Sequence, residues 1–251
     1  MNIQKLFEEG LQGFNIQEYI DLMSSDFPGF LRFSKALSDR KSSIKEMGFE
    51  LDRQLLFAWK KNGLLPFQGP SGAKKKSWSR FSFIELCWIQ VLIALRKQGV
   101  GIERLKIIMD KLFPENFIMR MLRRVPMNVI VSGIPELMDK LKADGIESIE
   151  NVEWEAEASD HLQDKQFSLF FCLILSTILM KSKVVLYLND EGEPGMIDLN
   201  KMRENPITGV VRAYDILDNP SVTTVNLSRI INDLFHFHPE VLKQLPGFDL
   251  K

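Results

Sequence analysis

The sequence is poor in the residues that crosslink secreted proteins or bind metal ions. It has two cysteines, Cys87 and Cys172, and three histidines. Both cysteines lie inside apolar runs, where a thiol behaves as a small buried hydrophobe. This argues against a disulfide framework and against a cysteine-rich metal cluster. The pattern His-Phe-His at 236–238 predicts two imidazoles on one side of a strand, but no cysteine or carboxylate pair accompanies it at metal spacing. We therefore expect no metal site and no cofactor.

Long apolar runs are also missing. The longest is FSLFFCLILSTILM at 167–180, which has fourteen residues, whereas a helix needs about 20 to span a bilayer. We interpret this run as a buried core helix. The N-terminal residues include acidic side chains and no apolar signal segment. We expect a cytoplasmic protein with no membrane-spanning segment.

Motifs of the common enzyme classes are absent. The sequence has no Gly-rich phosphate loop, no Gly-x-Ser-x-Gly and no His-Glu-x-x-His. The carboxylates of LNDEGEPGMID at 188–198 fall in an expected turn, where acidic residues are common because water solvates them. We expect that the protein is not an enzyme, and an activity stays open only through this C-terminal part.

The hydrophobic pattern predicts an α+β fold that is mainly α. We expect a helical N-terminal extension over residues 1–40, with helices near 15–23 and after Pro28. A second helical unit is expected over 41–113. A small α+β domain, for sensing or oligomerisation, is expected over 127–251. In this last part, KVVLYLNDEGEPGMIDL predicts two strands joined by a turn, and SVTTVNLSRIINDLF predicts a strand that passes into a helix.

One helix is specified more strongly than the others. Ser82 followed by Glu85 three residues later forms a capping box, and Gly99 provides a stop. Between residues 86 and 95 only Gln90 is polar, so this helix must be covered on several sides. We expect a buried central helix, covered in part by the N-terminal 40 residues or by a second chain. A further helix is expected after Gly101.

Basic residues are concentrated between residues 52 and 80. This segment holds seven lysines and arginines and one acid, a formal charge of +6 inside a chain of net charge −1. Clustering of this kind suits phosphate contacts, because each neutralised phosphate releases counterions. A solvated loop is the alternative if the triple lysine at 74–76 is considered alone.

Three stretches follow one another in the order of a winged helix-turn-helix. LFAWKKNGLLP at 56–66 places the aromatic Trp59 ahead of Gly-Leu-Leu-Pro. WSRFSFIEL at 78–86 has aromatic, serine and acidic residues in the order of a passage from wing to helix. The predicted central helix, with its Arg, Gly and apolar spacing, follows. On these stretches, residues 49–112 resemble the MerR-type winged helix-turn-helix family.

The resemblance implies a DNA-binding transcriptional regulator whose partner is double-stranded DNA. Residues 52–61 would form a recognition helix in the major groove, and residues 67–80 would form a wing that reaches phosphates. Arg53 and Gln54, early in the helix, are the candidates for contacts to base edges. The candidates for contacts to the DNA backbone are Lys60, Lys61, Lys74, Lys75, Lys76 and Arg80. The packing residues would be Trp59, Leu64, Leu65, Trp78 and Phe81.

An alternative hypothesis comes from two departures. Phe57 and Ala58 stand where the family carries an Arg-Tyr pair that contacts DNA. They would expose apolar surface where charge is expected, which favours a protein-interaction module on a winged-helix scaffold that no longer binds DNA. Pro114 also interrupts the long helix through which the family dimerises. A homodimer, and a small-molecule or protein effector at the C-terminal domain, are left open.

Overall fold

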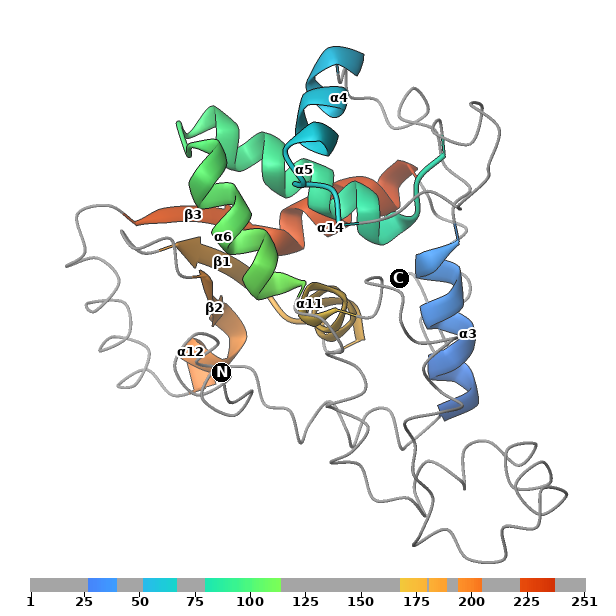
Figure 1. Cartoon of the computed structure of the whole chain (residues 1–251). Coiled ribbons are helices and arrows are strands. Elements are labelled where there is room, and N and C mark those ends of the chain that lie inside the picture. The colour runs from blue at the N-terminus through green and yellow to red at the C-terminus, as the bar shows by residue number, and fades with distance from the viewer. Residues whose placement is uncertain are drawn as a thin grey trace, which may run out of the picture.

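The computed structural model describes residues 27–39, 52–66, 80–113, 168–179, 181–188, 194–204 and 222–237. Over these residues the chain is mainly helical with a small antiparallel sheet, which confirms the predicted α+β class (Figure 1). The described helices are α3 (Phe27–Ser38), α4 (Arg53–Lys61), α5 (Phe83–Lys97), α6 (Ile102–Leu112), α11 (Leu169–Leu179), α12 (Leu199–Glu204) and α14 (Leu227–Phe237). The described strands are β1 (Val184–Leu188), β2 (Pro194–Asp198) and β3 (Thr223–Asn226). The predicted helix near 15–23 and most of the predicted wing, 67–79, lie outside the described residues.

Helix α5 begins and ends where the sequence predicts. The Glu85 amide donates to Ser82 Oγ at 3.2 Å, and the Ser82 amide donates to Glu85 Oε2 at 2.7 Å. This is the reciprocal pattern of a capping box, and both residues are buried. At the other end, Gly99 has φ +85°, which a glycine adopts without steric penalty. Local sequence signals therefore fix both ends of α5.

The central position of α5 is confirmed. Ten of its residues are buried, and only its C-terminal turn is largely exposed. Its cover comes mainly from α14 and β3, with α3 also in contact. Phe83 stacks on Phe235 of α14, with ring centroids 4.6 Å apart. The sequence analysis expects N-terminal residues or a second chain to cover this helix, and α3 meets that expectation in part. The cover by α14 was not expected, because an apolar pattern does not show which element packs on a helix.

The sheet has the order β2-β1-β3, with both pairs antiparallel. Leu186 of β1 lies opposite Met196 on one neighbour and Val225 on the other, and all three are buried. Tyr187 points to the opposite face and lies across from Gly195. A Cβ atom at Gly195 would overlap the Tyr187 ring, so any other residue there would require that ring to move. The predicted pair of strands and the strand before α14 are both confirmed.

Two further helices complete the core as predicted. Residues 169–178 of α11 are all buried, so the longest apolar run is a core helix. In α6, the buried residues Leu105, Ile108 and Leu112 recur at helical spacing and form one stripe. Among the described residues, no helix is both long and apolar enough to cross a membrane.

One apolar core joins elements that are far apart in the sequence. It extends from Phe33 in α3, through α5, α6 and α11, to the sheet and to Phe235 in α14. The side chain of Gln98, next to α5, also donates to the Thr224 carbonyl in β3 at 3.0 Å. The described elements on both sides of residues 114–127 therefore pack against each other. The predicted division into domains over 1–40, 41–113 and 127–251 stays a prediction.

Candidate nucleic-acid interface

Helix α4 is a short helix with its own start and stop signals. Asp52 is the N-cap, and its Oδ1 accepts from the Gln54 amide at 2.9 Å. Lys60 and Lys61 occupy the last turn, where cations interact favourably with the negative end of the helix dipole. The helix ends at Lys61, and Gly63 just beyond it has φ +71°. The sequence-predicted span of 52–61 is thus a helix, with Asp52 as its cap.

One side of α4 is anchored to the core. Trp59 is 1% exposed, and Leu64, just after the helix, is fully buried. The indole Nε1 of Trp88, in the middle of α5, donates to the Leu64 carbonyl at 2.8 Å. Leu56 and Leu65 are half-buried against the same core. These contacts hold α4 on the side of α5 that lies away from the sheet (Figure 1).

The opposite side of α4 is open to solvent. Gln54, Phe57, Lys60 and Lys61 are all exposed. At about 100° per residue, Gln54, Phe57 and Lys61 lie on the side opposite Trp59, and Lys60 lies on the flank next to them. Arg53 is the first helical residue. The structure thus places three of the predicted contact residues, Gln54, Lys60 and Lys61, on one exposed helix surface.

The other predicted contact residues lie on a different segment. Arg80 is exposed and lies two residues before the Ser82 cap of α5, outside α4. The capping box of α5 fixes the backbone that follows Arg80. Lys74, Lys75 and Lys76 lie outside the described residues.

Apolar exposure on α4 follows the sequence expectation only in part. Phe57 is 70% exposed, as expected for an aromatic residue at a position where the family has charge. Ala58 is instead half-buried, and Leu55, which the sequence analysis did not single out, is 38% exposed. Helical spacing from the buried Trp59 could have predicted which of these residues is most exposed, because Phe57 lies two positions and about 200° away from it.

The expected arrangement of the His-Phe-His pattern was wrong. His236 lies in α14, near the end of an amphipathic helix, and not in a strand. The apolar spacing of Ile231, Leu234 and Phe235 extends the helix through this pattern, because these side chains are buried against the core. His238 lies outside the described residues. Within the described ranges, no three His, Cys, Asp or Glu side chains are grouped so that they could hold a metal ion.

The buried thiol of Cys87 is not suited to chemistry. It is fully buried in α5, and burial raises its pKa well above the ordinary value of 9.0. A thiol that stays protonated is a poor nucleophile. Cys87 is therefore a packing residue, as its apolar context predicts.

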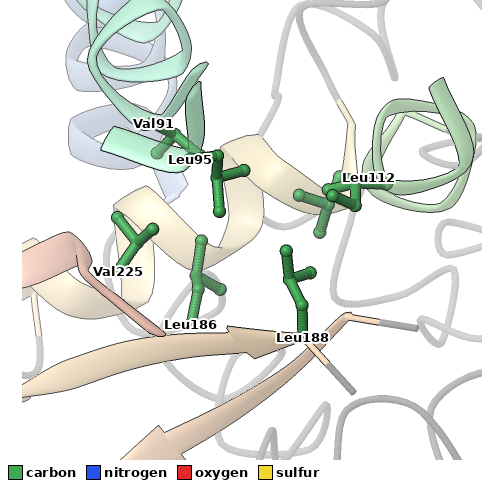
Figure 2. Close-up of a pocket in the computed structure, with 7 residues that line it drawn as sticks. Val91, Leu95, Leu112, Leu186, Leu188 and Val225 are labelled. Atoms are coloured by element: carbon green, nitrogen blue, oxygen red, sulfur yellow. The ribbon is translucent and has the colours of Figure 1, made fainter. Parts of the chain in front are cut away.

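A small pocket lies between α5, α6 and the sheet. Figure 2 shows Val91, Leu95 and Leu112 facing Leu186, Leu188 and Val225. The lining is entirely aliphatic, and the volume of about 10 Å³ is room for at most one water molecule. A pocket of this size and lining is a packing defect of the core and does not suit a small-molecule effector.

The exposed surface of α4 is thus the arrangement in the described residues that best fits a binding function. A comparison of the chain with protein-family models, with curated proteins and with solved structures finds no match.

Proposed function

We propose that this protein is a DNA-binding transcriptional regulator that contacts double-stranded DNA through α4. The observation that carries the proposal is the exposed side of α4, where Gln54 lies with Lys60 and Lys61. The major groove, about 12 Å wide, admits a helix. Lysines contribute to affinity through phosphate contacts, and Gln54 has the chemistry to read adenine.

The sequence supports the same proposal independently of the geometry of α4. Residues 49–112 resemble the MerR-type winged helix-turn-helix family in three ordered stretches. On this proposal Arg53 joins Gln54 at base edges. The wing over 67–80 contributes Lys74, Lys75, Lys76 and Arg80 to phosphate contacts. The protein would act in the cytoplasm as a regulator without enzymatic activity.

Two further features belong to the proposal. A homodimer would present two copies of α4 and bind a palindromic site. Light scattering in solution would measure the oligomeric state. An effector at the C-terminal part would need a site other than the aliphatic pocket between α5, α6 and the sheet, because that pocket is too small.

A protein-interaction module without DNA binding is the second candidate. It is favoured by the exposure of Phe57 and Leu55, because exposed apolar groups on a helix often mark a protein contact. This candidate predicts that the chain captures a protein partner from an extract treated with nuclease. Loss of every partner on nuclease treatment would contradict it.

The experiment that tests the DNA-binding proposal is selection of bound fragments from a sheared pool of the source genome. We expect enrichment of a specific site, followed by an affinity that falls as the salt concentration rises. Salt-sensitive binding without enrichment would make the protein a non-specific DNA binder. No binding at low salt would contradict the proposal and favour the protein-interaction module.

A further inference from the structure

The exposed side of α4 carries an aromatic ring that the fold does not use. Phe57 is 70% exposed, the highest value among the large exposed hydrophobic residues of the described ranges. Leu56 and Trp59, on the other side of the helix, already supply the packing against the core. A phenylalanine left in water forgoes the free energy that burial would provide. The ring is therefore available to a partner.

The described side chains next to Phe57 on the exposed part of α4 are cationic or polar. Lys60 and Lys61, three and four residues later, lie near it on the helix surface, and both are exposed. Gln54 lies three residues before it, also exposed. The one acid of this segment, Asp52, caps the helix through the Gln54 amide. An apolar ring between lysines and a glutamine complements a polyanion that offers both an apolar group and hydrogen-bonding edges.

Duplex DNA offers this combination in its major groove. Each A·T pair presents the 5-methyl group of thymine there, together with the N7 acceptor and N6 donor of adenine. Phosphates border the groove on both sides and attract lysines. A phenylalanine can contact the methyl group, and a glutamine can pair with adenine through two hydrogen bonds.

We propose that Phe57 is a specificity-determining residue that contacts the 5-methyl group of a thymine in the major groove. Gln54 would read an adenine of the same or a neighbouring base pair, since residues three apart on a helix have Cβ atoms about 5–6 Å apart. The inference rests on the proposed function, because α4 must enter the groove for either contact to form. The inference therefore predicts an A·T base pair in the DNA site where the DNA faces the middle of α4.

The test uses the DNA site obtained by the selection described above. Each thymine in turn is replaced by deoxyuridine, which lacks only the 5-methyl group, and the affinity of the full chain is measured by fluorescence anisotropy. We expect one thymine whose replacement weakens binding about fourfold, the effect of burying one methyl group. Phe57→Ala should weaken binding to the thymine site and bind the thymine and deoxyuridine sites equally.

A matched control is Phe237→Ala, which removes an exposed phenylalanine near the end of α14. This variant should keep the discrimination between thymine and deoxyuridine, because Phe237 lies in a different element. The double-mutant cycle between residue 57 and the methyl group isolates their interaction from any general change in affinity.

The outcomes separate this inference from the proposed function. If the wild-type chain binds its site but deoxyuridine has no effect at any thymine, or Phe57→Ala keeps the discrimination, the inference fails while DNA binding stands. If Phe57→Ala binds the site as well as wild type and loses a protein partner instead, Phe57 is a protein contact and the inference is overturned. If the wild-type chain binds no duplex, the proposed function fails, and this inference with it.

Discussion

Helices α4 and α5 follow one another in the described part of the chain and use their side chains in opposite ways. Ten residues of α5 are buried, with Trp88 fully enclosed. Among the side chains of α4 whose burial the structure describes, only Trp59 is buried, and most of the others face solvent. The Trp88 indole of α5 donates a hydrogen bond to the carbonyl of Leu64, which lies just after α4. This contrast indicates that α5 provides stability, whereas α4 is held in place by a few buried contacts and presents an exposed surface, which we propose is used for binding.

Among the substitutions that test this difference between α4 and α5, Trp88→Ala should have the largest effect on stability. Its ring forms edge contacts with Phe113 at 5.0 Å and Phe170 at 5.4 Å, and its Nε1 pairs with the Leu64 carbonyl. Removing it should lower the free energy of unfolding by about 3–5 kcal/mol, because it leaves a cavity and an unpaired carbonyl. Urea denaturation would measure this. Trp88→Phe, which keeps most of the apolar area, should cost clearly less, and equal stability of all three proteins would contradict the assigned role of α5.

The two N-caps offer a more finely matched comparison. Ser82→Ala should cost about 2 kcal/mol, the upper part of the range for caps, because it breaks a buried capping box. Asp52→Ala removes an exposed cap on the Gln54 amide and should cost about 0.5 kcal/mol. Thermal or urea unfolding of both variants would compare them. A larger loss of stability for Asp52→Ala than for Ser82→Ala would contradict this ranking of the two caps.

The pH dependence of stability should reveal the buried thiol of α5. Burial holds the Cys87 pKa above its ordinary value of 9.0, so the native state keeps a proton that the unfolded state loses at high pH. The stability that the fold gains from the protonated Cys87 thiol is fully present below about pH 9 and is lost as the pH rises further. The stability of wild type relative to Cys87→Ala should be constant from pH 7 to about pH 9 and then fall by up to about 1.4 kcal/mol per pH unit. A difference independent of pH would contradict the burial.

The smallest effect on stability should come from the exposed surface of α4. Phe57→Ala should change the free energy of unfolding by no more than about 0.5 kcal/mol, because the ring is 70% exposed. The same substitution is expected to change DNA recognition. A loss of several kcal/mol would mean that Phe57 packs against part of the fold, and the division between α4 and α5 would not hold.

The sequence predicted features that depend on neighbouring residues and missed those that depend on distant ones. The Ser82–Glu85 capping box, the stop at Gly99 and the burial of residues 169–178 within the longest apolar run are all local signals, and each is confirmed. The cover of α5 by α14 was not predicted, because apolar periodicity shows that a helix is buried and not which element covers it. His236 was placed in a strand because a three-residue alternation looked like period two.

The candidate site was predictable to a similar degree. The span 52–61 and the exposure of Phe57 were expected from the family resemblance, and the Asp52 cap, Gly63 and the burial of Trp59 are the local features that produce them in the structure. A hydrogen bond from the Trp88 indole could have been expected, because a buried indole N–H needs an acceptor. The identity of the acceptor could not, because the Leu64 carbonyl is 24 residues away in the sequence.

The most direct test of the central claim is the salt dependence of DNA affinity for Lys60→Ala/Lys61→Ala. The plot of log affinity against log salt should lose about 0.9 in slope for each phosphate contact, so roughly 2 in total, with affinity down by one to two orders of magnitude near 0.1 M salt. The matched control is Lys97→Ala/Lys183→Ala, which should keep the wild-type slope because these two exposed lysines lie elsewhere, at the end of α5 and just before β1. An unchanged slope for the α4 variant, or an equal loss in the control, would contradict the assignment of α4 as the DNA-contacting helix.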